Sequence, residues 1–219
     1  MVKIICKVIL DNLNLSLINK LYSLKVKKLE NIFLFLVVLG GKAKKANIEL
    51  HDVRWVVGSK IEDTYDTLRK DWFGSPKGLH IDSYKKIRYI DGYKINLINF
   101  EKDKIDKKQQ VKTNKAKIHL WFVNIGGYNS TSMQEKHEFG LVAASTKLEA
   151  TNIAKTKWLI GSKKKHKDDI ASIEMLTCCD DSMLIKKIGN WEIELTQDNK
   201  FTEENYYPDW YGYQKIDGI

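Results

Sequence analysis

The stretch LFLVVLGG, residues Leu34–Gly41, occurs a second time as LWFVNIGG at Leu120–Gly127. In both places β-branched, aromatic and other apolar residues run up to a double glycine, which is typical of a strand that ends in a tight turn. The two stretches begin 86 residues apart. A fixed spacing between similar segments is the signature of an internal repeat, and this repeat decides how the chain is divided.

Further matches follow in the same order. Three keep the spacing of 86 residues: ELHDVRWVVGS (Glu49–Ser59) with EKHEFGLVAAS (Glu135–Ser145), Trp72 with Trp158, and His80–Asp82 with His166–Asp168. An insertion expected near Met175–Lys187 then shifts the spacing, and the last match joins IDGYKINL (Ile90–Leu97) to IGNWEIEL (Ile188–Leu195). Matches in order over most of the chain indicate a tandem duplication.

Each copy is predicted to form strand, strand, helix, strand and strand. In the first copy the second strand covers His51–Val57, and Ser59 is the expected N-cap of a helix that runs to Trp72, with Glu62 completing a capping box. The last two strands, near Lys85–Ile90 and Tyr93–Ile98, are joined by Asp91-Gly92, a favoured hairpin turn. In the second copy Ser145 or Thr146 caps the helix.

The sequence therefore predicts an α+β protein with two tandem ββαββ units, mostly antiparallel sheets and a pseudo-twofold axis. The expected segments are an N-terminal extension at 1–31, repeat 1 at 32–99, a charged linker at 100–117, repeat 2 at 118–197 and an aromatic tail at 198–219. The extension is either a short amphipathic helix or an over-long gene start. Small units gain stability by packing on a twin, so the two repeats are expected to pair within the chain.

Composition narrows the class of protein. A chain of 219 residues with 43% hydrophobic residues and two Pro is globular rather than disordered. The net charge of +9 comes almost entirely from Lys, since only Arg54, Arg69 and Arg88 are Arg. Arg is the usual reader of guanine edges and phosphates, so specific nucleic-acid binding is disfavoured.

The chain is expected to be cytoplasmic and without a membrane partner. Its longest apolar run, Ile32–Leu39, is much shorter than the roughly 20 residues of a spanning helix. The N-terminus lacks a signal-peptide pattern. Cys6, Cys178 and Cys179 form neither a disulfide framework nor a metal knuckle, which fits free thiols in a reducing compartment.

The two copies of the pattern LGG…E-x-H-[DE]…W…H-x-D resemble the bacterial domain of unknown function 1543. Members of that family carry the domain once or twice per protein. The resemblance implies tandem domains and brings no assigned chemistry, cofactor or partner. Function has to be argued from the residues themselves.

The repeated polar residues are the candidate site. Side chains alternate between the faces of a strand, so Glu49 and His51 share a face with apolar Val53, as Glu135 and His137 do with Phe139. A polar pair at the mouth of a core-like face is a usual place for a pocket. The His-x-Asp elements complete the candidate set: Glu49, His51, His80, Asp82, Glu135, His137, His166 and Asp168.

Three function classes stay open at this stage. The favoured one is a non-catalytic binding or interaction module with a cleft between the repeats. A metal-dependent or acid–base enzyme would use the polar set, with His51, His137, Glu49 and Glu135 as the candidate metal ligands. The third class is Lys-driven nucleic-acid binding. A purely structural polar network would also explain the repeated residues, and no cofactor is implied.

Overall fold

The computed structural model describes residues 31–99, 117–127, 133, 135–158, 181–198 and 207–218. The predictions for the N-terminal extension, for nearly all of the charged linker and for the three cysteines lie outside these residues.

Both repeats form the predicted series of elements. Repeat 1 contains β1 (Phe33–Gly41), β2 (Leu50–Gly58), the 3-10 helix η1 (Ile61–Thr64), α2 (Tyr65–Asp71), β3 (His80–Ile87), β4 (Tyr89–Ile90) and β5 (Tyr93–Asn99). Repeat 2 contains β6 (His119–Gly127), β7 (Lys136–Ala144), α3 (Lys147–Lys157), β8 (Asp181–Ile185), β9 (Lys187–Ile188) and β10 (Trp191–Gln197). A last strand, β11 (Trp210–Lys215), comes from the aromatic tail. The α+β prediction is confirmed.

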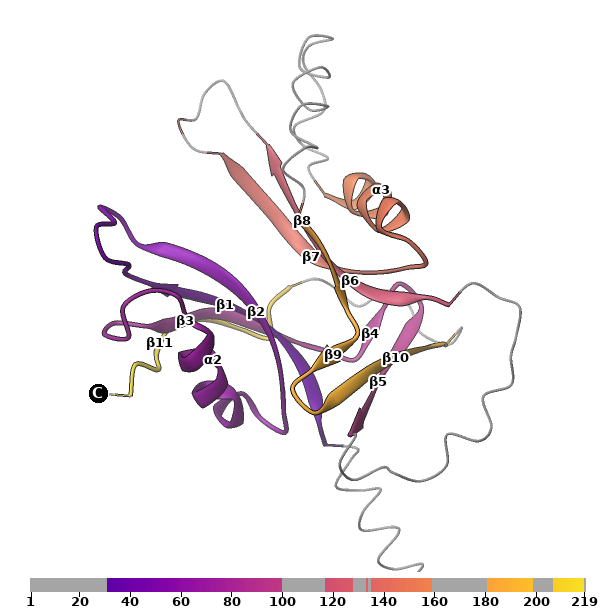
Figure 1. Cartoon of the computed structure of the whole chain (residues 1–219), viewed down its shortest axis with the longest axis horizontal. Coiled ribbons are helices and arrows are strands. Elements are labelled where there is room, and N and C mark those ends of the chain that lie inside the picture. The colour runs from indigo at the N-terminus through magenta and orange to yellow at the C-terminus, as the bar shows by residue number, and fades with distance from the viewer. Residues whose placement is uncertain are drawn as a thin grey trace, which may run out of the picture.

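The strands form three antiparallel sheets (Figure 1). In repeat 1 the order is β11-β3-β1-β2, and in repeat 2 it is β7-β6-β8. The third sheet, β4-β5-β10-β9, takes two strands from each repeat. The first two sheets are called sheet A and sheet C below, and the shared one sheet B.

Sheet B carries the pseudo-twofold axis. Antiparallel β5 and β10 pair so that Ile95 lies opposite Leu195, and Leu97 lies opposite Ile193. Ile193 and Leu195 are the repeat equivalents of Ile95 and Leu97. In both pairs the Ile of one repeat therefore lies opposite the Leu of the other, and exchanging the two strands leaves the pairing unchanged. Asn96 and Glu194 pair at the centre. This is the pattern of an isologous dimer interface, here within one chain.

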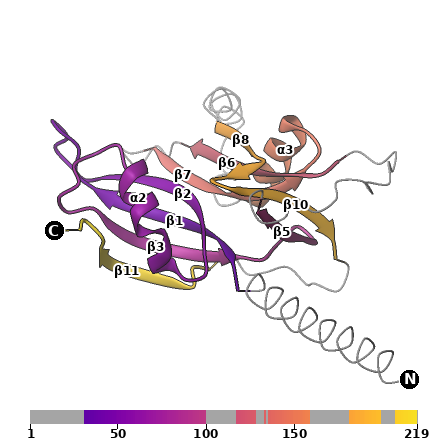
Figure 2. The same cartoon turned by 60° about the horizontal axis from the view of Figure 1, so that its bottom comes forward.

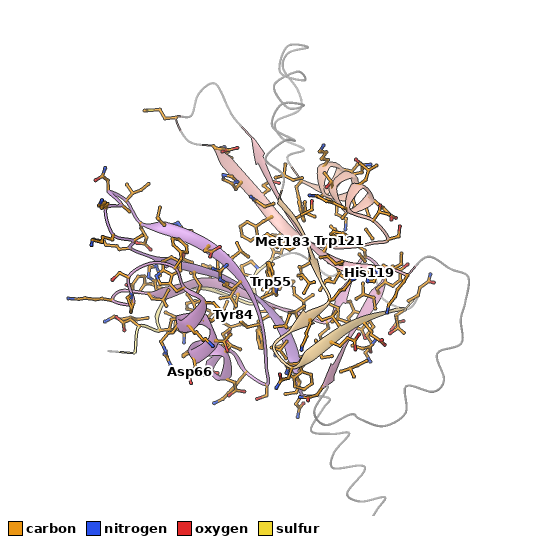
Figure 3. The ribbon with its side chains drawn as sticks, viewed as in Figure 1. Trp55, Asp66, Tyr84, His119, Trp121 and Met183 are labelled. Carbon is orange, nitrogen blue, oxygen red and sulfur yellow. The ribbon has the colours of Figure 1, made fainter. Side chains whose placement is uncertain are left out.

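The repeats meet through the inward faces of sheets A and C, while α2 and α3 cover the outward faces (Figure 1). Trp55 of β2 reaches Phe122 of β6, with ring centroids 5.0 Å apart, and Figure 3 places Trp55 between the two sheets. Ten buried residues form this shared core: Leu34, Ile87, Ile90, Ile95, Leu120, Phe122, Leu141, Ala143, Ile185 and Ile193. The sheets of the two repeats, rather than their helices, thus pack against each other.

The start of the first helix differs from the prediction. Lys60, not Ser59, is the N-cap, and Asp63, not Glu62, accepts the hydrogen bonds from Ser59 N–H, Ser59 Oγ and Lys60 N–H. The reason is that the helix begins one residue later than predicted, so that its N3 residue is Asp63 rather than Glu62. In repeat 2 Thr146, one of the two expected residues, is the N-cap, and Ser145 donates to Glu149 in the same way.

The third strand also differs from the prediction, since it begins at His80 rather than near Lys85, which places His80–Asp82 in sheet A. In the aromatic tail, β11 extends the edge of sheet A by pairing with β3, as Figure 2 shows. Of its aromatic side chains, Trp210 packs with the core under α2. Among the described residues, no helix is long and apolar enough to cross a membrane.

The shared core predicts that the two repeats unfold together. Leu34 is fully buried in it. Replacing Leu34 with Ala should lower the free energy of unfolding by about 2–5 kcal/mol, because the shortened side chain leaves an empty space between the repeats. Urea denaturation followed by fluorescence and circular dichroism should give one coincident transition. Ile48→Ala, at an exposed position, is the control and should change stability by less than about 0.5 kcal/mol. Two separate transitions, with only one of them shifted, would contradict the shared core.

The helix start predicts a pH dependence. The hydrogen bond from the Ser59 hydroxyl lowers the pKa of Asp63 below its ordinary value of 3.8. A carboxyl with a lowered folded-state pKa stabilises the fold above its ordinary pKa, and this is lost as pH falls through the folded value. The melting temperature of Asp63→Asn should therefore be lower than that of wild type at pH 7, and the difference should shrink towards pH 3. Asp66→Asn, which removes an exposed surface pair with Arg69, should change the melting temperature little. A difference for Asp63→Asn that does not depend on pH would contradict the role given to the Asp63 carboxylate.

Candidate functional site

Gly40 lies at the centre of the candidate site in repeat 1. Strand β1 runs between β2 and β3, and Gly40 pairs with His51 on one side and His80 on the other. A Cβ on Gly40 would lie 2.5 Å from Nε2 of His80, 2.6 Å from Oε1 of Glu49 and 2.9 Å from Oδ2 of Asp82. The absent side chain therefore makes room for the four polar side chains Glu49, His51, His80 and Asp82, called the Gly40 cluster below.

The Gly40 cluster belongs to the face of sheet A that looks towards repeat 2. Residues of β1 alternate, and Leu34 and Leu36 point into the core shared by the repeats. Gly40 follows on the same face, four residues beyond Leu36. On β2, His51 follows Val53 and Trp55 in the same way. The cluster thus lies at the end of the face that the two repeats bury between them.

Asp82 lies at a β-bulge. Val38 pairs with Ser83, and Leu39 pairs with Ile81, so Asp82 is an extra residue in β3. Strand alternation places Asp82 on the same face as His80, while Ile81 between them is buried under α2. The extra residue shifts the alternation that follows, so that Ser83, opposite Val38, also faces repeat 2.

The four side chains of the cluster form one network. Nε2 of His80 lies 2.7 Å from Oε1 of Glu49 and 3.2 Å from Oδ1 of Asp82. Nε2 of His51 lies 3.2 Å from Oδ2 of Asp82 and 3.9 Å from Oε1 of Glu49. The structure thus brings together all four residues predicted for repeat 1. His80 is buried, while the side chain of His51 is 57% exposed.

The surroundings of His80 fix the orientation of its ring. Nδ1 lies 2.8 Å from the carbonyl oxygen of Gly78, which can only accept, so this hydrogen bond needs the N–H at Nδ1. Nε2 points to the carboxylate groups of Glu49 and Asp82.

The C-terminal strand supports the cluster. The ring of Tyr213 packs on His80 with centroids 4.0 Å apart. The buried carboxylate of Asp217 accepts a hydrogen bond from the N–H of Gly78 at 3.0 Å, and Lys215 pairs with it. Asp217 thus fixes the loop whose carbonyl orients His80. Sequence reasoning missed Tyr213 and Asp217, because nothing local to the tail indicates that its partner is β3.

Repeat 2 has the matching half of the cluster. Gly126 pairs with His137, as Gly40 does with His51. Nε2 of His137 lies 3.5 Å from Oε2 of Glu135, and Nδ2 of Asn124 lies 3.4 Å from Nδ1 of His137. The Glu-x-His pair therefore takes the same place in both sheets.

His166 and Asp168 lie outside the described residues, so their place in a second cluster stays a prediction. In the described strands Val37 pairs with Tyr84, and the equivalent Val123 pairs with Ser182, which gives a spacing of 98 from Tyr84 to Ser182. The insertion therefore precedes Asp181.

A cavity of about 370 Å³ lies between sheets A and C. Its walls come from both repeats and are mainly apolar. Val38 on β1 is the next residue on the same face as Gly40, so the cavity and the Gly40 cluster occupy neighbouring parts of one face. The lining residues are Leu36, Val38, Ser83, Tyr84, Lys85, Ile87, Ile90, Glu138, Phe139, Gly140, Leu141, Trp158 and Pro208.

The fold and the site define a tandem-repeat α+β protein with a polar cluster at one end of an inter-repeat cavity. The family model for the Domain of Unknown Function (DUF1543) matches residues 46–97 and again residues 132–183. The chain belongs to this family and carries its domain twice.

One solved structure resembles the chain over most of its length. It is the crystal structure of a protein Il1583 from Idiomarina loihiensis, which is 32% identical in sequence. The match covers 84% of this chain and 98% of that chain, with a TM-score of 0.59. None of the curated proteins compared with the chain matches it.

Gly40 and Gly126 provide a matched test of the site. Gly40→Ala should lower the free energy of unfolding by about 1–3 kcal/mol, since its Cβ meets His80, which is held between Tyr213 and Gly78. Gly126→Ala should cost clearly less, because its nearest neighbour is the flexible end of Glu135. Urea denaturation of both variants gives the comparison. Equal losses of stability would mean that the packed His80 ring is not what distinguishes the two copies.

Proposed function

We propose that the protein is a non-catalytic binding module that takes a small molecule into the cavity between its repeats. The observation that carries the proposal is the position of the Gly40 cluster beside an apolar cavity. Ligand sites are commonly cavities of about 300–1,000 Å³ with apolar walls and a few convergent polar groups. The cavity of about 370 Å³ falls in this range. The ligand is a small molecule with an apolar body and one polar end.

The two ends of the cavity give the ligand a direction. Leu36 of β1 and Phe139 and Leu141 of β7 offer apolar contacts from both repeats. The Gly40 cluster offers carboxylates that are 39% exposed at Glu49 and 30% exposed at Asp82, and the half-exposed ring of His51. A ligand that bridges both repeats would also stabilise their packing, because it binds only the folded chain.

An acid–base enzyme is the second candidate, and one observation favours it. Asp82 holds Nε2 of the exposed His51, and a carboxylate that orients an imidazole is a common part of proton-transfer sites. In the described part of the chain, however, the polar partners of His51 are Glu49 and Asp82. Catalysis by a nucleophile would need a hydroxyl or thiol there as well. Binding therefore accounts for the geometry with fewer groups.

The cavity can be tested by filling it. Ser83 lines the cavity and is half-buried. Ser83→Trp should occupy the space, whereas the matched Ser83→Ala leaves it open. A library of small apolar fragments with one polar group would be screened by ligand-detected NMR on the wild-type protein. Fragments that bind should also bind Ser83→Ala and lose at least about tenfold in affinity for Ser83→Trp, since a filled cavity excludes them sterically.

Circular dichroism would show that both variants remain folded. Fragments that bind Ser83→Trp as well as wild type, or a library without a single binder, would overturn the proposal.

A further inference from the structure

We propose that the Gly40 cluster binds one divalent transition-metal ion of the zinc class, through His51, His80, Glu49 and Asp82. The inference goes beyond the cavity ligand and does not depend on it. It starts from the convergence of two Nε2 atoms and two carboxylates on the space above Gly40. Imidazole nitrogens and carboxylate oxygens are a usual donor set for such ions.

The spacing of the donors fits a shared ion after one small change. Two ligands of one ion, each about 2.0–2.2 Å from it, lie about 3.0–3.5 Å apart. Asp82 meets this spacing with both rings, since its oxygens lie 3.2 Å from Nε2 of His80 and 3.2 Å from Nε2 of His51.

The carboxylate of Glu49 does not yet have the spacing of a shared ligand. Its Oε1 lies 2.7 Å from His80 and 3.9 Å from His51, which is a hydrogen bond to one ring and no contact with the other. In the described part of the chain, no three donors surround an ion as they stand. Moving Oε1 by about half an ångström from His80 towards His51 would give both distances the spacing of shared ligands. The Glu49 side chain is 39% exposed, so it has room to move.

The charges of the cluster also favour an ion. Nε2 of the buried His80 faces Glu49 and Asp82, and Nε2 of His51 faces Asp82. A divalent ion would accept a lone pair from each ring and balance both carboxylates.

The outer contacts of the cluster are those of a supported ligand. A metal-binding His commonly donates its other N–H to a carbonyl or carboxylate, which fixes the ring. His80 does so to the carbonyl of Gly78, whose N–H is held by Asp217. Imidazole donors select ions of the zinc class over Mg²⁺ and Ca²⁺, which prefer oxygen donors throughout.

The test uses Zn²⁺ alone on the full chain. After treatment with a chelator and its removal, isothermal titration with Zn²⁺ should show one strong site per chain, and Mg²⁺ should give no binding. His51→Ala should weaken the Zn²⁺ affinity by at least about tenfold, because it removes a direct ligand. The matched control is His137→Ala, the repeat equivalent with similar exposure, which should leave the strong site unchanged. Circular dichroism would show that both variants are folded.

A second readout identifies the donor atoms. The Co²⁺-loaded protein should show visible bands of a nitrogen- and oxygen-bound ion, without a thiolate-to-cobalt charge-transfer band. The proposal is overturned by any of four results: no Zn²⁺ uptake by wild type, equal affinity in His51→Ala, an equal loss in His137→Ala, or a thiolate band, which would assign the ion to cysteines.

Discussion

The structure depends on one constraint: sheets A and C each have two apolar faces, and the helix of the same repeat can cover only one of them. In repeat 1, α2 packs on the face that carries Phe35 and Leu39, and the opposite face carries Leu34. The same division holds in repeat 2 around α3. The inward faces must therefore cover each other. Pairing of β5 with β10 brings them together, and Asp91 strengthens the join by accepting from the N–H of Ala143 and pairing with Lys157.

The position of the polar cluster follows from that packing. Sheets A and C meet near the shared sheet B and splay apart towards the ends of their first hairpins (Figure 1). Near the join the space is filled by rings such as Trp55 and Phe122. Towards the open ends water can reach polar groups such as His51 and Glu49, and the buried His80 is paired with carboxylates. Carboxylates and imidazoles are thus confined to the end of the inward face, where Gly40 and Gly126 leave room for them.

Local patterns in the sequence were sufficient to predict the repeat, the order of its elements and the Glu-x-His pair of each repeat. The Asp91-Gly92 turn is present with positive φ at both residues, as its sequence predicts. Glu49 and His51 could be placed on one face because strands alternate strictly. Asp82 could not, since the strand that carries it was expected to begin only near Lys85 and begins at His80.

Non-local contacts were beyond what a single sequence reveals. The partner of β11 lies more than a hundred residues earlier in the chain. No local pattern therefore pointed to Tyr213 on His80 or to Asp217 on Gly78. The start of the first helix was missed for a different reason: Glu62 and Asp63 are both acidic, and Asp63 is selected because the N-cap is Lys60 rather than Ser59.

The support from β11 has a consequence for the order in which the protein is made. Glu49, His51, His80 and Asp82 all leave the ribosome early, but the strand that packs on His80 and holds Gly78 follows repeat 2. A nascent chain that ends after repeat 1 has every cluster residue and lacks both the twin sheet and the supporting strand. The first-made site is therefore the last to be completed, and chains that stop short of β11 would carry it in an unsupported form.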